Sequence, residues 1–237
     1  MSELLVVGGT SGLGLEFIKA RISVGDKVVV VSRQELNLKG VTSIICDLSD
    51  TQEVSHKIKE LLRLKLSFDS LLFFQRSRKD SNEDSWQSEF DVAVSSTRQF
   101  LQSSKNMLRT EGDKSIIIVN SIASTFISRD ATDGYQISKA ALLHLARYYA
   151  VLLGKQGIRV NTVTPFTFVK EISKDFFESN QDWHKIVEKR IPLGRICTPG
   201  EIIDLIEFLR GEKSKYITGQ EIIIDGGITL SLGVDLS

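Results

Sequence analysis

Short runs of aliphatic and β-branched residues recur along the chain, and most of them are continuous rather than alternating with polar positions. Continuous apolar runs of this length are typical of strands that are covered on both faces of a parallel sheet. The pattern therefore predicts seven strands, at residues 4–7, 27–31, 43–45, 71–74, 116–119, 159–162 and 221–224.

The segments between these runs carry apolar residues at helical spacing. Val54, Ile58 and Leu61 form one stripe, and a wider stripe runs through 141–153. Strand and helix thus alternate from end to end, which is typical of a doubly wound α/β sheet that binds ligands at the carboxyl ends of its strands. No linker or repeat interrupts this order, so we expect a single domain over 1–237. The polar segment 76–88 is expected to be a solvated loop or the start of a helix.

The composition is that of an ordinary globular protein. Of the 237 residues, 41% are hydrophobic and 25% are charged, which excludes a disordered or disulfide-stapled chain. Thirty basic residues balance thirty acidic ones, so no net field favours a nucleic acid or a membrane surface as partner. We therefore expect a small-molecule partner.

The cysteines, the histidines and the lengths of the apolar runs indicate where the protein is located and whether it binds a metal. Cys46 and Cys197 are isolated, and no apolar run approaches the length of a membrane span, which together indicate a cytoplasmic protein. The three histidines share no metal-ligand spacing, so we expect no metal site.

A glycine-rich turn follows the first predicted strand and leads into an amphipathic segment. Glycines let the backbone approach a diphosphate closely, and the N–H groups and dipole of the helix that follows favour an anion. We expect a nucleotide here, although a structural tight turn also needs glycine. The residues expected against the nucleotide are Gly8, Thr10, Ser11, Gly12, Leu13 and Gly14.

The ends of the second and third strands indicate which nucleotide is bound. Ser32 and Arg33 stand where an acidic residue would hold the ribose 2′-hydroxyl of NAD. A guanidinium pairs bidentately with a 2′-phosphate, so NADP(H) is favoured over NAD(H), the alternative being a plain surface arginine. Asp47 and Leu48 are placed to meet the adenine, and Asp47 equally suits the N-cap of the next helix.

Tyr135 and Lys139 are four residues apart, which on a helix puts both side chains on one face, and Ser121 lies just after the fifth strand. A free phenol is a poor base at neutral pH, and a buried ammonium nearby stabilises its phenolate. Tyr135 would exchange a proton with a carbonyl or alcohol oxygen that Ser121 also hydrogen-bonds, while a nicotinamide exchanges a hydride with the carbon. Lys139 would also reach the cofactor ribose.

Taken together, these motifs resemble those of the short-chain dehydrogenase/reductase family over essentially the whole chain: GGTSGLG, CDLS, VNS, YQISK, GIRVNTVTP, IPLGR and ITGQEIIIDGG. The resemblance implies a Rossmann-type fold, an NAD(P)(H) cofactor and chemistry at a carbonyl/alcohol pair. It assigns the catalytic roles to Ser121, Tyr135 and Lys139. It also implies a homodimer or a homotetramer.

Several positions depart from the family pattern. The usual Asn-Asn-Ala-Gly after the fourth strand is replaced by a segment that puts bulky side chains and Gln75 beside the cofactor. Its last residue, Arg76, either contacts a phosphate or an anionic substrate or turns into solvent. The family's fourth catalytic position, an Asn that organises a water, falls on Ser95, which offers one hydroxyl in place of an amide. Pro165 is followed by Phe166 in place of Gly, so the nicotinamide end is held differently.

The resemblance further implies a mobile substrate cover at about 167–195, with Phe168 against the cofactor. Phe176, Phe177 and Trp183 within it suit either the core of the cover or a cage around a ligand.

These observations predict an NADP(H)-dependent oxidoreductase for a small carbonyl or alcohol compound, with Tyr135 as general acid and base. Two alternatives stay open. The departures suggest a nucleotide-binding sensor or scaffold with weak or no catalysis. Arg76, Arg78 and Lys79 suggest a phosphate-linked or nucleotide-linked substrate.

Overall fold

A seven-stranded sheet forms the centre of the molecule in the computed structural model, which describes residues 1–77, 85–129, 131–168 and 181–231. The strand order is β3-β2-β1-β4-β5-β6-β7, and every neighbouring pair is parallel. The predicted doubly wound α/β fold is confirmed. The strands are β1 Glu3–Val7, β2 Lys27–Ser32, β3 Val41–Ile45, β4 Ser70–Phe73, β5 Lys114–Val119, β6 Ile158–Pro165 and β7 Glu221–Ile224.

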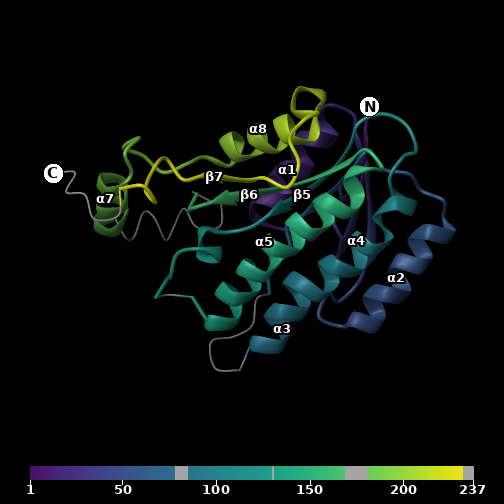
Figure 1. Ribbon diagram of the computed structural model, residues 1–237, viewed down its shortest axis with the longest axis horizontal. Helices are drawn as coiled ribbons and strands as arrows, with labels where there is room; N and C mark the ends of the chain where they lie inside the picture. The colour runs from purple at the N-terminus through teal and green to yellow at the C-terminus, as the bar shows by residue number, and fades with distance from the viewer. Residues whose placement is uncertain (78–84, 130, 169–180, 232–237) are drawn as a thin grey trace.

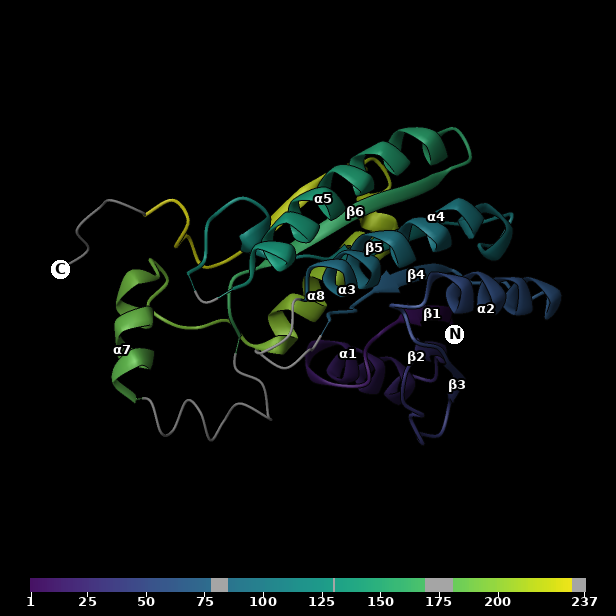
Figure 2. The same ribbon diagram turned by 90° about the horizontal axis from the view of Figure 1, so that it is seen from below.

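Helices cover both faces of this sheet (Figures 1 and 2). One face carries α2 (Thr51–Arg63), α4 (Ser96–Met107) and α5 (Asp133–Gly154), and the other carries α1 (Gly12–Ser23) and α8 (Pro199–Arg210). The short helix α3 (Trp86–Phe90) and the π-helical turn η1 (Asp91–Ser95) run directly into α4. The remaining helical elements are η2 (Ile122–Ser124), α7 (Gln181–Arg190) and η4 (Glu212–Ser214).

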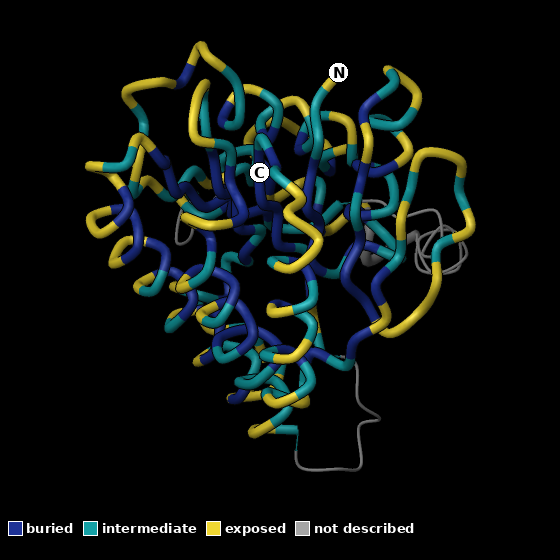
Figure 3. The backbone as a smooth tube through the Cα atoms, turned by 90° about the vertical axis from the view of Figure 1, so that its right-hand side faces the viewer, coloured by how far each residue is buried: buried dark blue, intermediate teal, exposed yellow. Residues whose placement is uncertain are grey.

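Two apolar clusters fill the spaces between the sheet and its helix layers. Leu4 to Val7 of β1 are fully buried, because β1 lies between β2 and β4 with helices on both sides. The α2 stripe of Val54, Ile58 and Leu61 is buried as its spacing predicts. Each such side chain stabilises the fold by roughly 1.5–3 kcal/mol. The edge strands β3 and β7 are only partly buried, and Figure 3 shows buried backbone gathered in the centre of the molecule.

Strand β6 extends past the predicted 159–162 to Pro165. Thr164, beyond the predicted end, is polar, yet it is buried and donates a hydrogen bond to Glu221 at 2.8 Å. Buried polar side chains that find a partner fit a central strand as well as apolar ones do.

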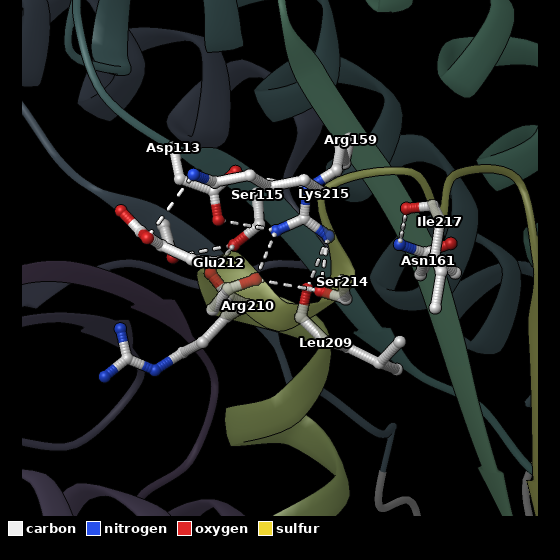
Figure 4. A network of polar contacts seen from close by, with 12 residues as sticks. Asp113, Ser115, Arg159, Asn161, Leu209, Arg210, Glu212, Ser214, Lys215 and Ile217 are labelled. Carbon is white, nitrogen blue, oxygen red and sulfur yellow. Dashed lines mark hydrogen bonds and ion pairs between the residues drawn. The ribbon is translucent and has the colours of Figure 1, made fainter.

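A buried arginine links β6 to the end of α8 (Figure 4). The Arg159 guanidinium pairs with Asp113 at 2.8 Å and donates to the Leu209 carbonyl at 2.6 Å and to the Ser214 hydroxyl at 2.9 Å. Only 6% of Arg159 is exposed, so its charge requires these partners. The arginine of the GIRVNTVTP motif is therefore structural.

Helix α2 is capped by Asp50, which accepts hydrogen bonds from the backbone N–H groups of Gln52 and Glu53. The alternative role of Asp47 as this N-cap is wrong. Asp47 lies three residues too early and accepts hydrogen bonds from Ser49 instead.

Parts of two predicted segments lie outside the described residues. In the segment 76–88, residues 78–84, which include Arg78 and Lys79, lie outside the described residues. The helix expected in this segment begins at Trp86. In the predicted cover 167–195, the residues outside are 169–180, with Phe176 and Phe177, and the side chain of Trp183 is likewise not described. Beyond them, Val187, Ile191 and Ile196 pack with Ile228.

Neither cysteine forms a disulfide. Burial raises the pKa of the Cys46 thiol to about 12 and that of the Cys197 thiol to about 11, so neither is a nucleophile at neutral pH. None of the helices in the described part of the chain is both long and apolar enough to cross a bilayer.

Candidate active site

A cleft of about 820 Å³ lies along the carboxyl ends of the strands. Its walls come from the segments that follow β1 to β7, because parallel strands bring their carboxyl ends to one edge of the sheet. The predicted catalytic residues Ser121, Tyr135 and Lys139 line it. So do the predicted cofactor residues Gly8, Thr10, Ser11, Gly12, Leu13, Gly14, Ser32, Arg33, Asp47, Leu48, Gln75, Pro165 and Phe168.

The glycine turn after β1 is packed too tightly for side chains. Gly8 has φ +81°, and a Cβ on it would lie 2.7 Å from the backbone nitrogen of Gln75. A Cβ on Gly14 would lie 2.4 Å from the Cα of Gly9. The turn therefore presents bare backbone to the cleft at the start of α1, which is the arrangement that accommodates a diphosphate.

One end of the cleft carries Arg33 and Asp47. Arg33 is exposed and has no salt-bridge partner among the described residues. Burial alone would raise the pKa of Asp47, but hydrogen bonds from Ser49 and the charge of Arg33 hold it below its usual value. Asp47 therefore stays ionised near neutral pH, and the Arg33 guanidinium remains available to a ligand.

The bulky residues after β4 leave the cleft open. Phe73 is buried on the α4 side of the sheet, where its ring lies 6.1 Å from that of Phe100. Phe74 packs beside α1, with its ring centre 5.4 Å from that of Phe17. The two phenylalanines thus stand on opposite faces of the sheet, as successive residues of a strand must, and only Phe74 borders the cleft.

At the other end of the cleft, helix α5 begins two residues before Tyr135. Thr132 caps the helix by accepting the backbone N–H of Tyr135 at 3.2 Å, and it donates to the carboxylate of Glu89 at 2.8 Å. Gly134 lets α3 approach, since a Cβ there would lie 2.5 Å from a carboxylate oxygen of Glu89. These contacts fix the first turn of α5 against α3 and hold Tyr135 in the wall of the cleft.

Lys139 lies one helical turn after Tyr135 and is almost completely buried. Its Nζ is 5.7 Å from the centre of the Tyr135 ring and donates to the Val119 carbonyl at 3.5 Å. Burial, and to a smaller extent the charge of Arg76, lower the pKa of Lys139 to about 8. The predicted pairing of Tyr135 and Lys139 on one face of a helix is therefore present.

Ser121 follows β5 and begins the short helix η2. Its hydroxyl oxygen accepts a hydrogen bond from the backbone N–H of Ala123 at 3.2 Å, which restricts the rotation of the hydroxyl group. The hydroxyl hydrogen itself is not donated to any of the described residues. A hydroxyl of this kind can donate to a ligand oxygen in the cleft.

Arg76 is solvent-exposed and borders the cleft. Its guanidinium carbon lies 4.8 Å from the centre of the Tyr135 ring, within the range of a cation–π contact, and the residue lines the cleft. The residue before it is anchored, because the Gln75 amide donates to the Thr97 hydroxyl at 2.5 Å.

Ser95 is the predicted site residue that the cleft excludes. It ends the π-helical turn η1, and its hydroxyl donates to the Asp91 carboxylate at 2.8 Å. Since it does not line the cleft, no contact supports its predicted place beside the reacting groups.

Asn120 and Thr229 are among the cleft residues that the sequence reasoning missed. Asn120, just before Ser121, is 5% exposed and donates to the Lys139 carbonyl at 3.3 Å. Its position directly after a central parallel strand was the available signal. Thr229 reaches the cleft from the segment after β7, where Asp225 accepts its backbone N–H and its hydroxyl. No local pattern marks that long-range contact.

The residues fit an NAD(P)(H) dinucleotide. Gln75 Oε1 and Asn120 Oδ1 are buried acceptors with no partner in the described part of the chain, and both residues line the cleft. A buried acceptor without a partner is costly, and a dinucleotide carries amide and hydroxyl donors that suit it. The glycine turn suits the diphosphate.

Comparisons with known proteins agree with this architecture. Residues 11–229 match a family model described as enoyl-(acyl carrier protein) reductase. A tropinone reductase homolog of Arabidopsis thaliana is 32% identical over 245 residues, covering 96% of this chain and 79% of that protein.

Solved structures are similar over nearly the full length. A short chain dehydrogenase family protein from Francisella tularensis superposes with a TM-score of 0.82 at 28% identity, covering 97% of this chain and 99% of that one. A 4-hydroxyisoleucine dehydrogenase complexed with NADH superposes with a TM-score of 0.84 at 23% identity and the same coverage, so it shares the fold.

Proposed function

This chain belongs to the short-chain dehydrogenase/reductase family, and on that premise we propose that it is an NADP(H)-dependent oxidoreductase for a small carbonyl or alcohol compound. The observation that carries the proposal is the pairing of Tyr135 with the buried Lys139 in a cleft that Ser121 also lines. These three side chains provide a proton donor, a positive charge and a second hydrogen-bond donor within one site.

A bound NADPH would supply the hydride that the carbonyl carbon accepts, which is the two-electron part of the reduction. The side chains supply the rest of the reduction. Tyr135 donates its phenolic proton to the carbonyl oxygen, and Ser121 hydrogen-bonds the same oxygen while negative charge develops on it. The C=O bond thereby becomes a C–H and an O–H bond, and Tyr135 is left as a phenolate that takes a proton back from solvent.

Lys139 stabilises that phenolate. Two unit charges roughly 5 Å apart attract each other by about 3 kcal/mol at the effective dielectric constant of a protein site.

The preference for NADP(H) over NAD(H) rests on Arg33. Its guanidinium lies free at the end of β2, on the wall of the cleft, and can pair bidentately with a 2′-phosphate. The Asp47 carboxylate nearby is occupied by hydrogen bonds from Ser49.

One observation favours the second candidate function, a nucleotide-binding protein with weak or no catalysis. Ser95 is bonded to Asp91 rather than directed at the cleft, so it offers nothing in the place of the family's water-organising Asn. Proton return to Tyr135 would then be slow, while nucleotide binding would be unaffected.

The test is a titration of the purified protein with NADPH and NADH, followed by a screen of ketones and aldehydes that monitors NADPH consumption. We expect tighter binding of NADPH and turnover of at least one carbonyl compound. NADPH binding without turnover of any compound in the screen would favour the second candidate, and no nucleotide binding would contradict both.

We also propose that 1–237 forms one domain and that the chain assembles as a homodimer or homotetramer. The assembly is supported by apolar side chains that α5 leaves in solvent, among them Tyr148 at 56% and Val151 at 80% exposure. The cytoplasmic location stays a prediction.

A further inference from the structure

The Arg76 guanidinium stands at the reacting end of the cleft. It lies over the Tyr135 ring, and it has no carboxylate within salt-bridge distance in the described part of the chain. An arginine that stacks on an aromatic ring keeps its N–H edges directed outward, where they can bind an anion bidentately.

The charges that line the cleft are unevenly distributed. Arg33 and Asp47 lie together near the ends of β2 and β3, so they offset each other. Around Tyr135 the charged lining residues among those described are Arg76 and Lys139, both cationic. Their mutual repulsion is one cause of the lowered pKa of Lys139. A ligand that brings a negative charge to this end would relieve that repulsion.

Arg76 is held where it can meet such a ligand. It follows β4 directly after Gln75, whose side chain is 6% exposed and is tied to Thr97 on α4. The backbone of Gln75 also packs against Gly8, so the base of the Arg76 side chain is fixed by two elements. The guanidinium itself remains accessible from the cleft.

We propose that Arg76 binds an anionic group of the substrate, a carboxylate or a phosphate, close to the carbonyl that Tyr135 protonates. The inference rests on the proposed function and narrows its substrate class. Because the guanidinium lies over the ring whose hydroxyl meets the carbonyl oxygen, only a few bonds separate the two groups. The predicted substrates are short 2-oxo or 3-oxo acids, or ketones that carry a phosphate at similar distance.

The experiment compares each anionic probe with a neutral partner of the same carbon skeleton. Acetoacetate is paired with methyl acetoacetate, and dihydroxyacetone phosphate with dihydroxyacetone, all with saturating NADPH. Wild type, Arg76→Gln and Arg76→Lys are compared with Arg63→Gln, which removes an exposed arginine at the far end of α2. The two probe pairs separate a carboxylate from a phosphate ligand.

We expect the wild type to prefer the anionic member of at least one pair. Arg76→Gln should lower kcat/KM for that anion by about 10- to 100-fold, the usual effect of a lost charge-assisted hydrogen bond. It should change kcat/KM for the neutral partner by only a few-fold, with Arg76→Lys in between and Arg63→Gln at wild-type values. An equal loss for both members would show instead that Arg76 acts only on Tyr135.

A binding measurement keeps the inference separate from the proposed function. Calorimetric titration of the NADP⁺-loaded protein with acetoacetate and with dihydroxyacetone phosphate should show at least one anion binding, and at least 10-fold more weakly in Arg76→Gln. The NADP⁺ affinity itself should stay within a few-fold. A drop in NADP⁺ affinity of the same size would assign Arg76 to the cofactor phosphates, and a wild type that binds neither anion would overturn the inference, whether or not it reduces neutral ketones.

Discussion

The Nζ of Lys139 lies 5.7 Å from the centre of the Tyr135 ring, and only 4% of Lys139 is exposed. The ammonium is thus shielded from water. It lies beside Tyr135, which is the one tyrosine among the described residues that line the cleft. Desolvation makes its charge act strongly on that phenol, and the same desolvation makes the charge easier to lose. Both effects lead to measurable consequences.

Tyr135→Phe removes the proposed proton donor while keeping the ring under Arg76. We expect kcat to fall by about 10²- to 10⁴-fold, the usual contribution of general acid catalysis, with the Kd for NADPH within a few-fold of wild type. Tyr216→Phe, at a fully exposed tyrosine, is the matched control and should keep wild-type turnover. If Tyr135→Phe retained a tenth or more of the wild-type kcat, the proposed mechanism would be wrong.

The pH dependence of reduction should report Lys139. Its pKa is about 8, below the ordinary value of a lysine, so the ammonium is lost as the pH rises through that value. Because the charge stabilises the phenolate formed at Tyr135, kcat/KM for carbonyl reduction should be constant below pH 8 and decline above it. The profile of kcat/KM is the right measurement, since it reports groups of the free enzyme.

Arg76→Gln should shift this alkaline limb. The Arg76 charge is the second cause of the lowered pKa of Lys139, after burial, so its removal should move the limb to higher pH. The neutral ketone is the substrate to use, because it separates the electrostatic effect from anion binding. Arg63→Gln should leave the pH of the alkaline decline in kcat/KM unchanged. If Arg76→Gln also left it unchanged, the group that titrates there would not be Lys139.

Arg33→Gln should distinguish the two nicotinamide cofactors. Loss of a bidentate charged contact with the 2′-phosphate should weaken NADPH binding by about 10- to 100-fold, whereas NADH lacks that phosphate and should bind almost as before. Fluorescence titration of both cofactors measures the difference, with Arg63→Gln as the control for loss of one positive charge. Equal weakening of both cofactors would contradict the assignment.

Comparing alanine substitutions at two glycines with the same φ angle distinguishes the cost of backbone strain from the cost of steric crowding in the nucleotide turn. Gly8 and Gly112 both have φ +81°, but a Cβ on Gly112 meets nothing within 4 Å, while one on Gly8 meets the backbone of Gln75. Gly112→Ala should cost about 1–2 kcal/mol of unfolding free energy from the left-handed conformation alone. Gly8→Ala should cost a further 1–3 kcal/mol or so from overpacking, and should abolish NADPH binding. Urea unfolding and cofactor titration measure both, and equal costs at the two sites would refute the close approach.

Arg159→Leu should destabilise the fold strongly without touching the cleft. Removal of one partner from a buried ion pair costs about 3–5 kcal/mol, because Asp113 and the Leu209 carbonyl lose their donor. Lys215→Ala, which breaks the exposed pair with Glu212, should change the unfolding free energy by less than about 1 kcal/mol. Denaturant midpoints provide the comparison, and a small effect of Arg159→Leu would show that water replaces its contacts.

The fold and the outline of the site follow from the amino-acid pattern along the chain. Continuous apolar runs alternating with helical stripes require a parallel sheet, and a parallel sheet brings the residues after its strands to one edge. That is why the sequence alone predicts that Gly8, Arg33 and Ser121 lie in one cleft, as the structure shows. The spacing of Tyr135 and Lys139 was sufficient because a single helix carries both.

Contacts between elements that are distant in sequence are visible only in the folded molecule. The direction of Arg76, the bond that takes Ser95 away from the cleft, and the arrival of Thr229 from the far end of the chain all follow from packing across helices and strands. Local periodicity shows which face a residue occupies but not which residue meets it there. The reach of a side chain and the depth of its burial are properties of the assembled layers.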